Sequence, residues 1–183
     1  MNSYLESIKK QFLYYKMLGE KAMEQLTEEQ LFWQYNEESN SIAILVNHIA
    51  GNMLSRFTDF LTTDGEKGWR NRDSVFTNSF LNETEMMNYW NKGWECLLTT
   101  LEQLSEKDLE KIIYIRNDGH TVVEAINRQL AHYPYHIGQM VFIAKMLKNE
   151  AWNTLSIARN KSGDYNNRKF SQEKSKRHYT DDL

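Results

Sequence analysis

Apolar side chains recur at alternating spacings of three and four residues in four long segments of this chain. That spacing places them along one face of an α-helix, so each segment predicts an amphipathic helix. A fold made of strands is disfavoured, because it needs many turns and the 183 residues include one proline and eight glycines. The sequence therefore predicts an all-α four-helix bundle. Its helices are expected at about Tyr4–Leu26, Ser41–Thr62, Asn82–Leu104 and Thr121–Leu147.

Local signals mark where three of these helices begin. A residue that caps helix N-termini well stands at each predicted start, namely Ser41, Asn82 and Thr121. At the last two, a glutamate follows three residues later in the pattern of a capping box. Pro134 lies inside the fourth segment and predicts a kink between Leu130 and Pro134. Asn117-Asp118-Gly119 lies between β-prone residues and predicts a small hairpin or extended arm.

The chain divides by composition near residue 159. We expect a bundle domain over residues 1–158 and a polar, basic, partly ordered C-terminal arm over residues 159–183. The arm holds seven Lys and Arg against four Asp and Glu, about +3, which leaves about −6 for the rest of a chain of net charge −3. The connection between the second and third helices, up to Leu81, is long for a bundle loop, and such loops often carry function.

Composition also disfavours several classes of protein. The net charge of −3 gives no general attraction to nucleic acid or to an anionic membrane. Binding of nucleic acid through the basic arm is disfavoured, because the arm lacks the basic stripe with interleaved aromatic residues that is expected of a binding face. Cys96 is the single cysteine, so an intramolecular disulfide and a Cys-rich zinc module are both excluded. The polar N-terminus does not read as a signal peptide, and no apolar run approaches the ~20 residues of a membrane span. We therefore expect a cytoplasmic protein with no nucleic-acid or membrane partner.

Three histidines carry the chemistry. His132 and His136 are four residues apart, which stacks two imidazoles on one face of the fourth helix. His48 stands in the same relation to the apolar stripe of the second helix, so the three rings are expected to converge at the edge of the bundle. Three neutral imidazoles would form a metal site with open coordination positions. The alternative is that each histidine is a hydrogen-bonded core residue.

Polar side chains near the histidines are candidates for substrate binding. Asn52 lies four residues after His48, and Gln129 lies three before His132, so both are expected to face the same cavity. Arg128, four residues before His132, could hold an anionic group of a substrate. The alternative for Asn52 and Gln129 is that they only solvate the rim of the site, and for Arg128 that it is a solvated surface residue.

At these residues the sequence resembles the DinB/YfiT-like superfamily of metal-dependent proteins. The resemblance rests on His48, on His132-x-x-x-His136 followed by Ile137-Gly138-Gln139, and on the segment from Trp152 to Asn166. It implies an up-down-down-up bundle whose three histidines bind a divalent ion, commonly nickel or zinc. It also implies a low-molecular-weight thiol as a possible co-substrate, since relatives include thiol S-transferases. The Trp152–Asn166 segment resembles an uncharacterised branch.

Two classes of function follow from this reading. The first is a metal-dependent transferase or hydrolase that activates a thiol or water for attack on a small-molecule substrate. The second is a non-catalytic metal-binding or stress-related binding bundle. The resemblance further suggests a homodimer. Trp69, Phe76 and Phe80 make the long connection aromatic, and such residues tend to be covered either by their own subunit or by a partner.

Overall fold

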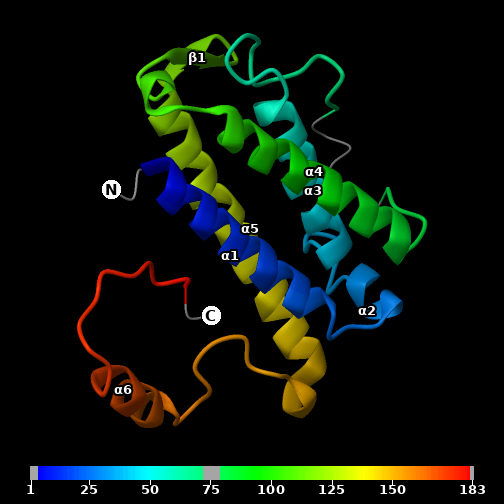
Figure 1. Cartoon of the computed structure of the whole chain (residues 1–183). Helices are drawn as coiled ribbons and strands as arrows, with labels where there is room; N and C mark the ends of the chain where they lie inside the picture. The colour runs from blue at the N-terminus through cyan, green and yellow to red at the C-terminus, as the bar shows by residue number, and fades with distance from the viewer. Residues whose placement is uncertain (1–3, 72–78, 182–183) are drawn as a thin grey trace.

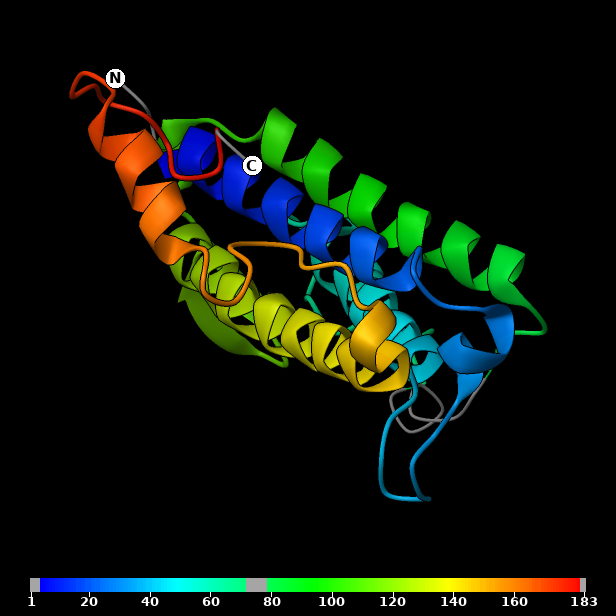
Figure 2. The same ribbon diagram turned by 90° about the horizontal axis from the view of Figure 1, so that it is seen from below.

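Four long helices packed side by side form the body of the molecule (Figures 1 and 2). The computed structural model describes residues 4–71 and 79–181. The fold is mainly helical, as the apolar periodicity predicts. The long helices are α1 (Tyr4–Met23), α3 (Ile42–Phe57), α4 (Glu83–Gln103) and α5 (Val122–Lys148).

Shorter elements connect and extend these helices. They are α2 (Glu28–Phe32), β1 (Ile112–Ile115), β2 (Asp118–Thr121), α6 (Ser162–Phe170) and the 3₁₀ turns η2 (Glu106–Asp108) and η3 (Asn149–Ala151). The first helix was predicted to end at Leu26, but α1 ends at Met23 and the chain then turns into α2. Thr27 caps α2, and its capping box with Gln30 starts this helix, whose five residues are too few to give a periodic signal.

The predicted N-caps are confirmed at Ser41, Asn82 and Thr121, where each side chain accepts a hydrogen bond from the backbone N–H three residues on. At Thr121 the full capping box forms with Glu124. At Asn82 it does not, because the Glu85 carboxylate accepts from the Leu81 N–H instead. Helix α5 runs without interruption through Pro134.

Aromatic side chains from three helices meet in the core. Phe12 of α1, Trp90 and Trp94 of α4 and Tyr133 of α5 are completely buried. Their rings lie edge-on or tilted, with Trp94 between 5.4 and 6.4 Å from the other three. Gly19 of α1 makes room for them, since a Cβ there would lie 3.1 Å from the Trp90 ring.

Side-chain contacts define how the four helices run. Tyr4, at the start of α1, donates to the Val123 carbonyl at the start of α5 (3.4 Å), and Gln25 after α1 bonds to Asn153 after α5. These two helices therefore lie side by side in the same direction. Helices α3 and α4 are also in extensive contact. Gly93 of α4 lies directly against Ala50 of α3.

The predicted hairpin forms before α5, but its turn lies one residue earlier than expected. Strands β1 and β2 pair antiparallel with Ile115 opposite Asp118. The two turn residues are thus Arg116 and Asn117, both with positive φ (57° and 64°), as in a type I′ turn. Asp64 stabilises this conformation by accepting from the backbone N–H groups of both residues at 2.9 Å. Glycine is therefore not needed at the turn itself.

The connection after α3 is hydrogen-bonded to the hairpin. Its aromatic residues differ in how far they are covered by the rest of the chain. The Gly65 N–H donates to the Tyr114 carbonyl at 2.8 Å. Trp69 is 61% exposed. Phe80 packs on Tyr89 of its own chain, with ring centroids 5.7 Å apart. Phe76, which contributes to the predicted aromatic character, lies outside the described residues.

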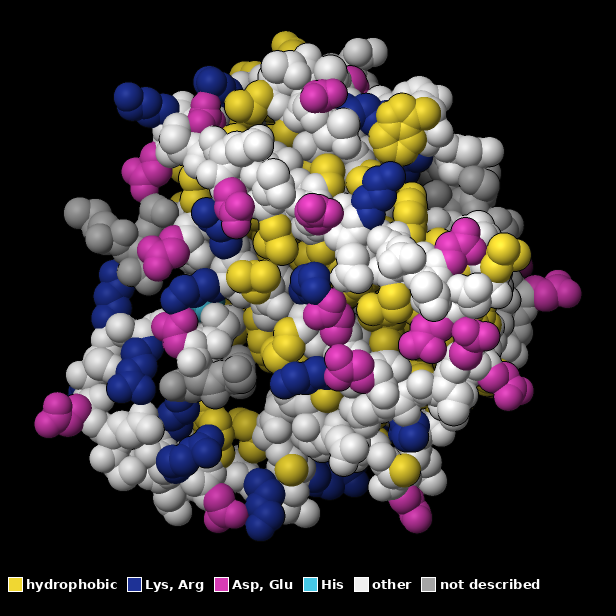
Figure 3. All heavy atoms as spheres, turned by 45° about the vertical axis from the view of Figure 1, so that its right-hand side comes forward, with side chains coloured by type: hydrophobic (Ala, Val, Ile, Leu, Met, Phe, Trp, Pro, Cys, Tyr) yellow, Lys and Arg dark blue, Asp and Glu magenta, His cyan; other side chains and the backbone are white. Residues whose placement is uncertain are grey.

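The segment after η3 forms α6 and then returns to the bundle (Figures 1 and 2). Lys and Arg side chains gather over it at the lower left of Figure 3. Its end rests on α1, where Lys10 pairs with Asp181 at 2.6 Å and the Tyr14 ring meets Tyr179 edge-on. Among the described residues, no helix has both the length and the apolar content needed to cross a bilayer.

Candidate metal centre

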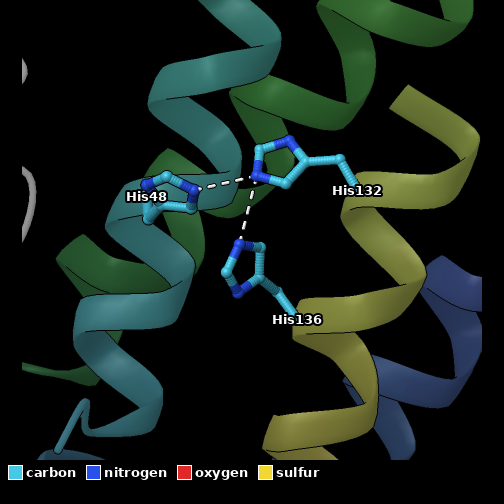
Figure 4. Close-up of side chains that lie close together, drawn as sticks. All are labelled: His48, His132 and His136. Atoms are coloured by element: carbon cyan, nitrogen blue, oxygen red, sulfur yellow. Dashed lines mark hydrogen bonds between the residues drawn. The ribbon is translucent and has the colours of Figure 1, made fainter. Parts of the chain in front are cut away.

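The three predicted histidines converge between α3 and α5 (Figure 4). His132 Nε2 lies 3.0 Å from His48 Nε2 and 3.1 Å from His136 Nε2. One ligand nitrogen from each ring lies within 4.8 Å of the other two. His48 and His136 are buried and His132 is half-buried. The helical spacing of four in α5 and the packing of α3 against α5 together produce this arrangement.

Two glutamine side chains orient the histidines of α5. Gln129 Oε1 lies 3.3 Å from His132 Nδ1, and Gln139 Oε1 lies 2.8 Å from His136 Nδ1. A glutamine oxygen can only accept, so each Nδ1 carries the proton and each Nε2 presents its lone pair. The Gln139 NH₂ group donates to the Tyr135 hydroxyl (3.4 Å), which is consistent with this orientation of the amide. Such partners are typical of metal-binding histidines.

The resulting donor set suits a cation. With Nδ1 protonated in both rings, the 3.1 Å contact between His132 Nε2 and His136 Nε2 has no hydrogen to share. Nitrogens bound at about 2.0–2.1 Å to a tetrahedral zinc ion lie about 3.3 Å apart, close to the two spacings seen here. A divalent ion bound between the rings would thus relieve the repulsion of the facing lone pairs.

Burial keeps these imidazoles in the neutral form that a metal requires. Desolvation lowers the pKa of His132 to about 4, with further lowering from His136 and from nearby arginines. Desolvation also lowers the pKa of His136, opposed by its hydrogen bond to Gln139. Both rings are therefore neutral at pH 7.

The other predicted site residues lie beside the histidines. Asn52 and Gln129 are buried, whereas Arg128 is exposed. All three line a polar cavity of about 360 Å³ that opens onto His48 and His132. The buried Tyr133 hydroxyl donates to Asn52 Oδ1 at 3.0 Å and fixes the amide, so that its NH₂ group is the part that can donate to a ligand.

Four further residues of this region are not among the predicted site residues. Gln139 follows His136 by three residues, a helical spacing that could have identified it. Arg56 continues the series His48, Asn52 at intervals of four on α3 and could have been found in the same way. Arg70 and Arg116 also line the cavity, but they come from loops, where no periodicity indicates a direction.

Comparison with known proteins places the chain in a family. A family profile described as "Protein of unknown function (DUF1572)" matches residues 1–161. The chain belongs to this family. No curated protein matches it significantly. The matched region of this DUF1572 protein contains all three histidines, both orienting glutamines and all four arginines of the cavity.

Metal occupancy of this DUF1572 protein should depend on pH in a defined direction. Protons compete with metal for Nε2, and an ordinary imidazole has a pKa of about 6.5. Because the pKa values of His132 and His136 are lowered, protonation begins to compete only below that value. We expect occupancy to fall as the pH drops from neutral toward about 4. Equilibrium dialysis followed by metal analysis measures this, and an occupancy that stays constant from neutral to strongly acidic pH would contradict histidine ligation.

Proposed function

We propose that this chain is a divalent-metal-dependent enzyme that brings a thiol or water to a small electrophilic substrate. The convergence of three imidazole Nε2 atoms next to a polar cavity is the observation that carries the proposal. The facial arrangement from two helices leaves one side of the site facing that cavity, where catalytic metal sites keep an open position. Imidazole ligands suit nickel or zinc, and we propose one of these two.

We also propose that the chain is a DinB/YfiT-like protein with the up-down-down-up order of helices that this resemblance implies. The contact of Tyr4 with Val123 supports the parallel pair α1 and α5. Ala50 lies against Gly93, and the Thr100 hydroxyl donates to the Phe57 carbonyl. From the first of these contacts to the second, the chain advances by seven residues in α3 and by seven in α4. Both helices therefore run in the same direction, which supports a parallel pair. The colour gradient of Figure 1 agrees with both pairs.

Each residue around the site has a definable task under this proposal. His48, His132 and His136 would hold the ion, which when bound supplies Lewis-acid activation and so lowers the pKa of a thiol or water. Gln129 and Gln139 keep Nε2 of the α5 histidines deprotonated and aimed at a common point. Tyr133, completely buried, fixes the side chain of Asn52 at the cavity wall.

A panel of thiols and electrophiles tests the proposed chemistry. Transfer to a thiol is tested with bacillithiol, mycothiol and glutathione, each combined with haloaromatic, epoxide and ester substrates. Hydrolysis is tested with the same substrates in the absence of a thiol. We expect turnover that requires added nickel or zinc and is lost in His132→Ala. Turnover that is equal in the wild type and in His132→Ala would show that the reaction does not use this site.

We further propose that the protein is a homodimer. The 61% exposed Trp69 supports this, because a large aromatic side chain on a surface loop is commonly part of an interface. Light scattering at micromolar concentration should give twice the chain mass of 21.8 kDa. Trp69→Ala should then reduce the mass toward that of one chain. Tyr35→Ala, which removes another exposed aromatic side chain, is the control. A wild-type mass of one chain would refute the dimer.

A further inference from the structure

Four arginines from separate parts of the chain converge on the cavity beside the histidines. Arg56 comes from α3, Arg128 from α5, Arg116 from the hairpin turn, and Arg70 from the segment that follows α3. The guanidinium group is planar and always charged, and it binds carboxylates and phosphates in a bidentate manner. Gathering four such groups in a cavity of about 360 Å³ is unfavourable unless anions balance them.

The carboxylate of Glu66 pairs with three of these four arginines. Glu66 accepts from Arg56 at 3.3 Å and Arg116 at 2.7 Å and lies 3.8 Å from Arg70. The nearby Asp64 directs its oxygens to backbone N–H groups of Glu66 and the hairpin turn. One carboxylate is thus shared by three guanidinium groups.

Arg128 stands apart from this network. The described residues place no acidic side chain within ion-pair distance of it, although it lines the same cavity. It is also exposed, so no packing requirement explains its position. Arg128 is therefore the guanidinium best placed to take a ligand from solution, with the buried Arg56 side chain deeper in the cavity.

We infer that this cavity is an oxyanion-binding subsite, and that the small molecule on which the protein acts carries a carboxylate or phosphate group held by Arg128 and the arginines bound to Glu66. This inference rests on the proposed function, since the cavity also contains His48 and His132. A ligand anchored by its anionic group would present its remaining atoms to the histidines. Asn52 and Gln129, which line the wall between the two groups, supply polar contacts along its length.

Calorimetric titration of the metal-free full-length protein tests the subsite without relying on activity. Inorganic phosphate and acetate are titrated in separate experiments, with chloride keeping the ionic strength constant. Comparing the two experiments distinguishes recognition of phosphate from recognition of carboxylate. We expect saturable binding of at least one of the two at one site per chain. Loss of one charge-assisted contact in Arg128→Gln should weaken that binding about ten-fold. Arg159→Gln is the matched control, because it removes the same charge from an exposed arginine that does not line the cavity.

The outcomes separate this inference from the proposed function. Absence of saturable binding for both oxyanions, or equal weakening by Arg128→Gln and Arg159→Gln, would overturn the subsite. Arg128→Gln should keep its full content of zinc or nickel, and His132→Ala should still bind the oxyanion when metal-free. If metal binding fails while the oxyanion binds, the proposed function falls and the anion site stands. If metal binds but neither oxyanion does, the anion site falls and the proposed function stands.

Discussion

Replacing His132 with alanine should lower the affinity for zinc or nickel by more than about 100-fold, since removal of the outer partners of metal ligands alone costs about 10–100-fold. His132 Nε2 is the nitrogen that lies near both others, at 3.0 and 3.1 Å. Without the His132 imidazole, only His48 and His136 of this group can bind the ion. His48→Ala should have a similar effect, because it removes the whole contribution of α3.

Competition titration against a chromophoric chelator measures these affinities. His120→Ala is the matched control, since His120 lies on β2 and is not part of the three-histidine group. The helical circular dichroism spectrum of each metal-free variant should equal that of the wild type, which separates loss of a ligand from loss of fold. Equal metal affinity in the wild type, His48→Ala and His132→Ala would rule out this centre.

Replacing Gly93 with alanine should destabilise the fold by about 3 kcal/mol, the upper part of the range for overpacking a core. A Cβ at this position would lie 2.7 Å from the Ala50 Cα and 2.8 Å from its Cβ. The first of these atoms is backbone, so no side-chain rotation relieves the clash and α3 and α4 must separate. Because α3 carries His48, the variant should also bind metal more weakly than the wild type.

Gly138→Ala provides the matched control, because it is the same substitution inside another long helix. A Cβ at Gly138 meets no atom within 4 Å. Without a clash, the better helix propensity of alanine should stabilise the protein by about 0.5–1 kcal/mol. Urea unfolding of both variants gives the two free energies. A Gly93→Ala variant as stable as the wild type would show that α3 and α4 are not packed this closely.

The residues that follow a helical period were the ones that the sequence could predict. The stripes of apolar residues gave the four long helices, and capping residues placed their starts at Ser41, Asn82 and Thr121. The same periodicity related the two histidines of α5 to each other and to Gln129. These relations are local, because residues three or four apart on a helix are neighbours whatever the rest of the chain does.

The features that were missed depend on contacts between distant segments. Arg70 and Arg116 reach the cavity from loops, and both contact Glu66 there. The hairpin turn is another case, because Asn117-Asp118-Gly119 suggested a turn one residue later than the Arg116-Asn117 turn that Asp64 holds. Gly93 gives no signal in the sequence, since its role is defined by Ala50 on a different helix.

The coordination of zinc in the one-to-one complex decides whether the three histidines form a metal centre. X-ray absorption at the zinc edge of the loaded protein reports the number of imidazole rings around the ion. We expect three imidazole nitrogens at about 2.0–2.1 Å, with a solvent ligand completing the coordination. A zinc ion surrounded only by oxygen, or one that retains three imidazoles in His132→Ala, would contradict it.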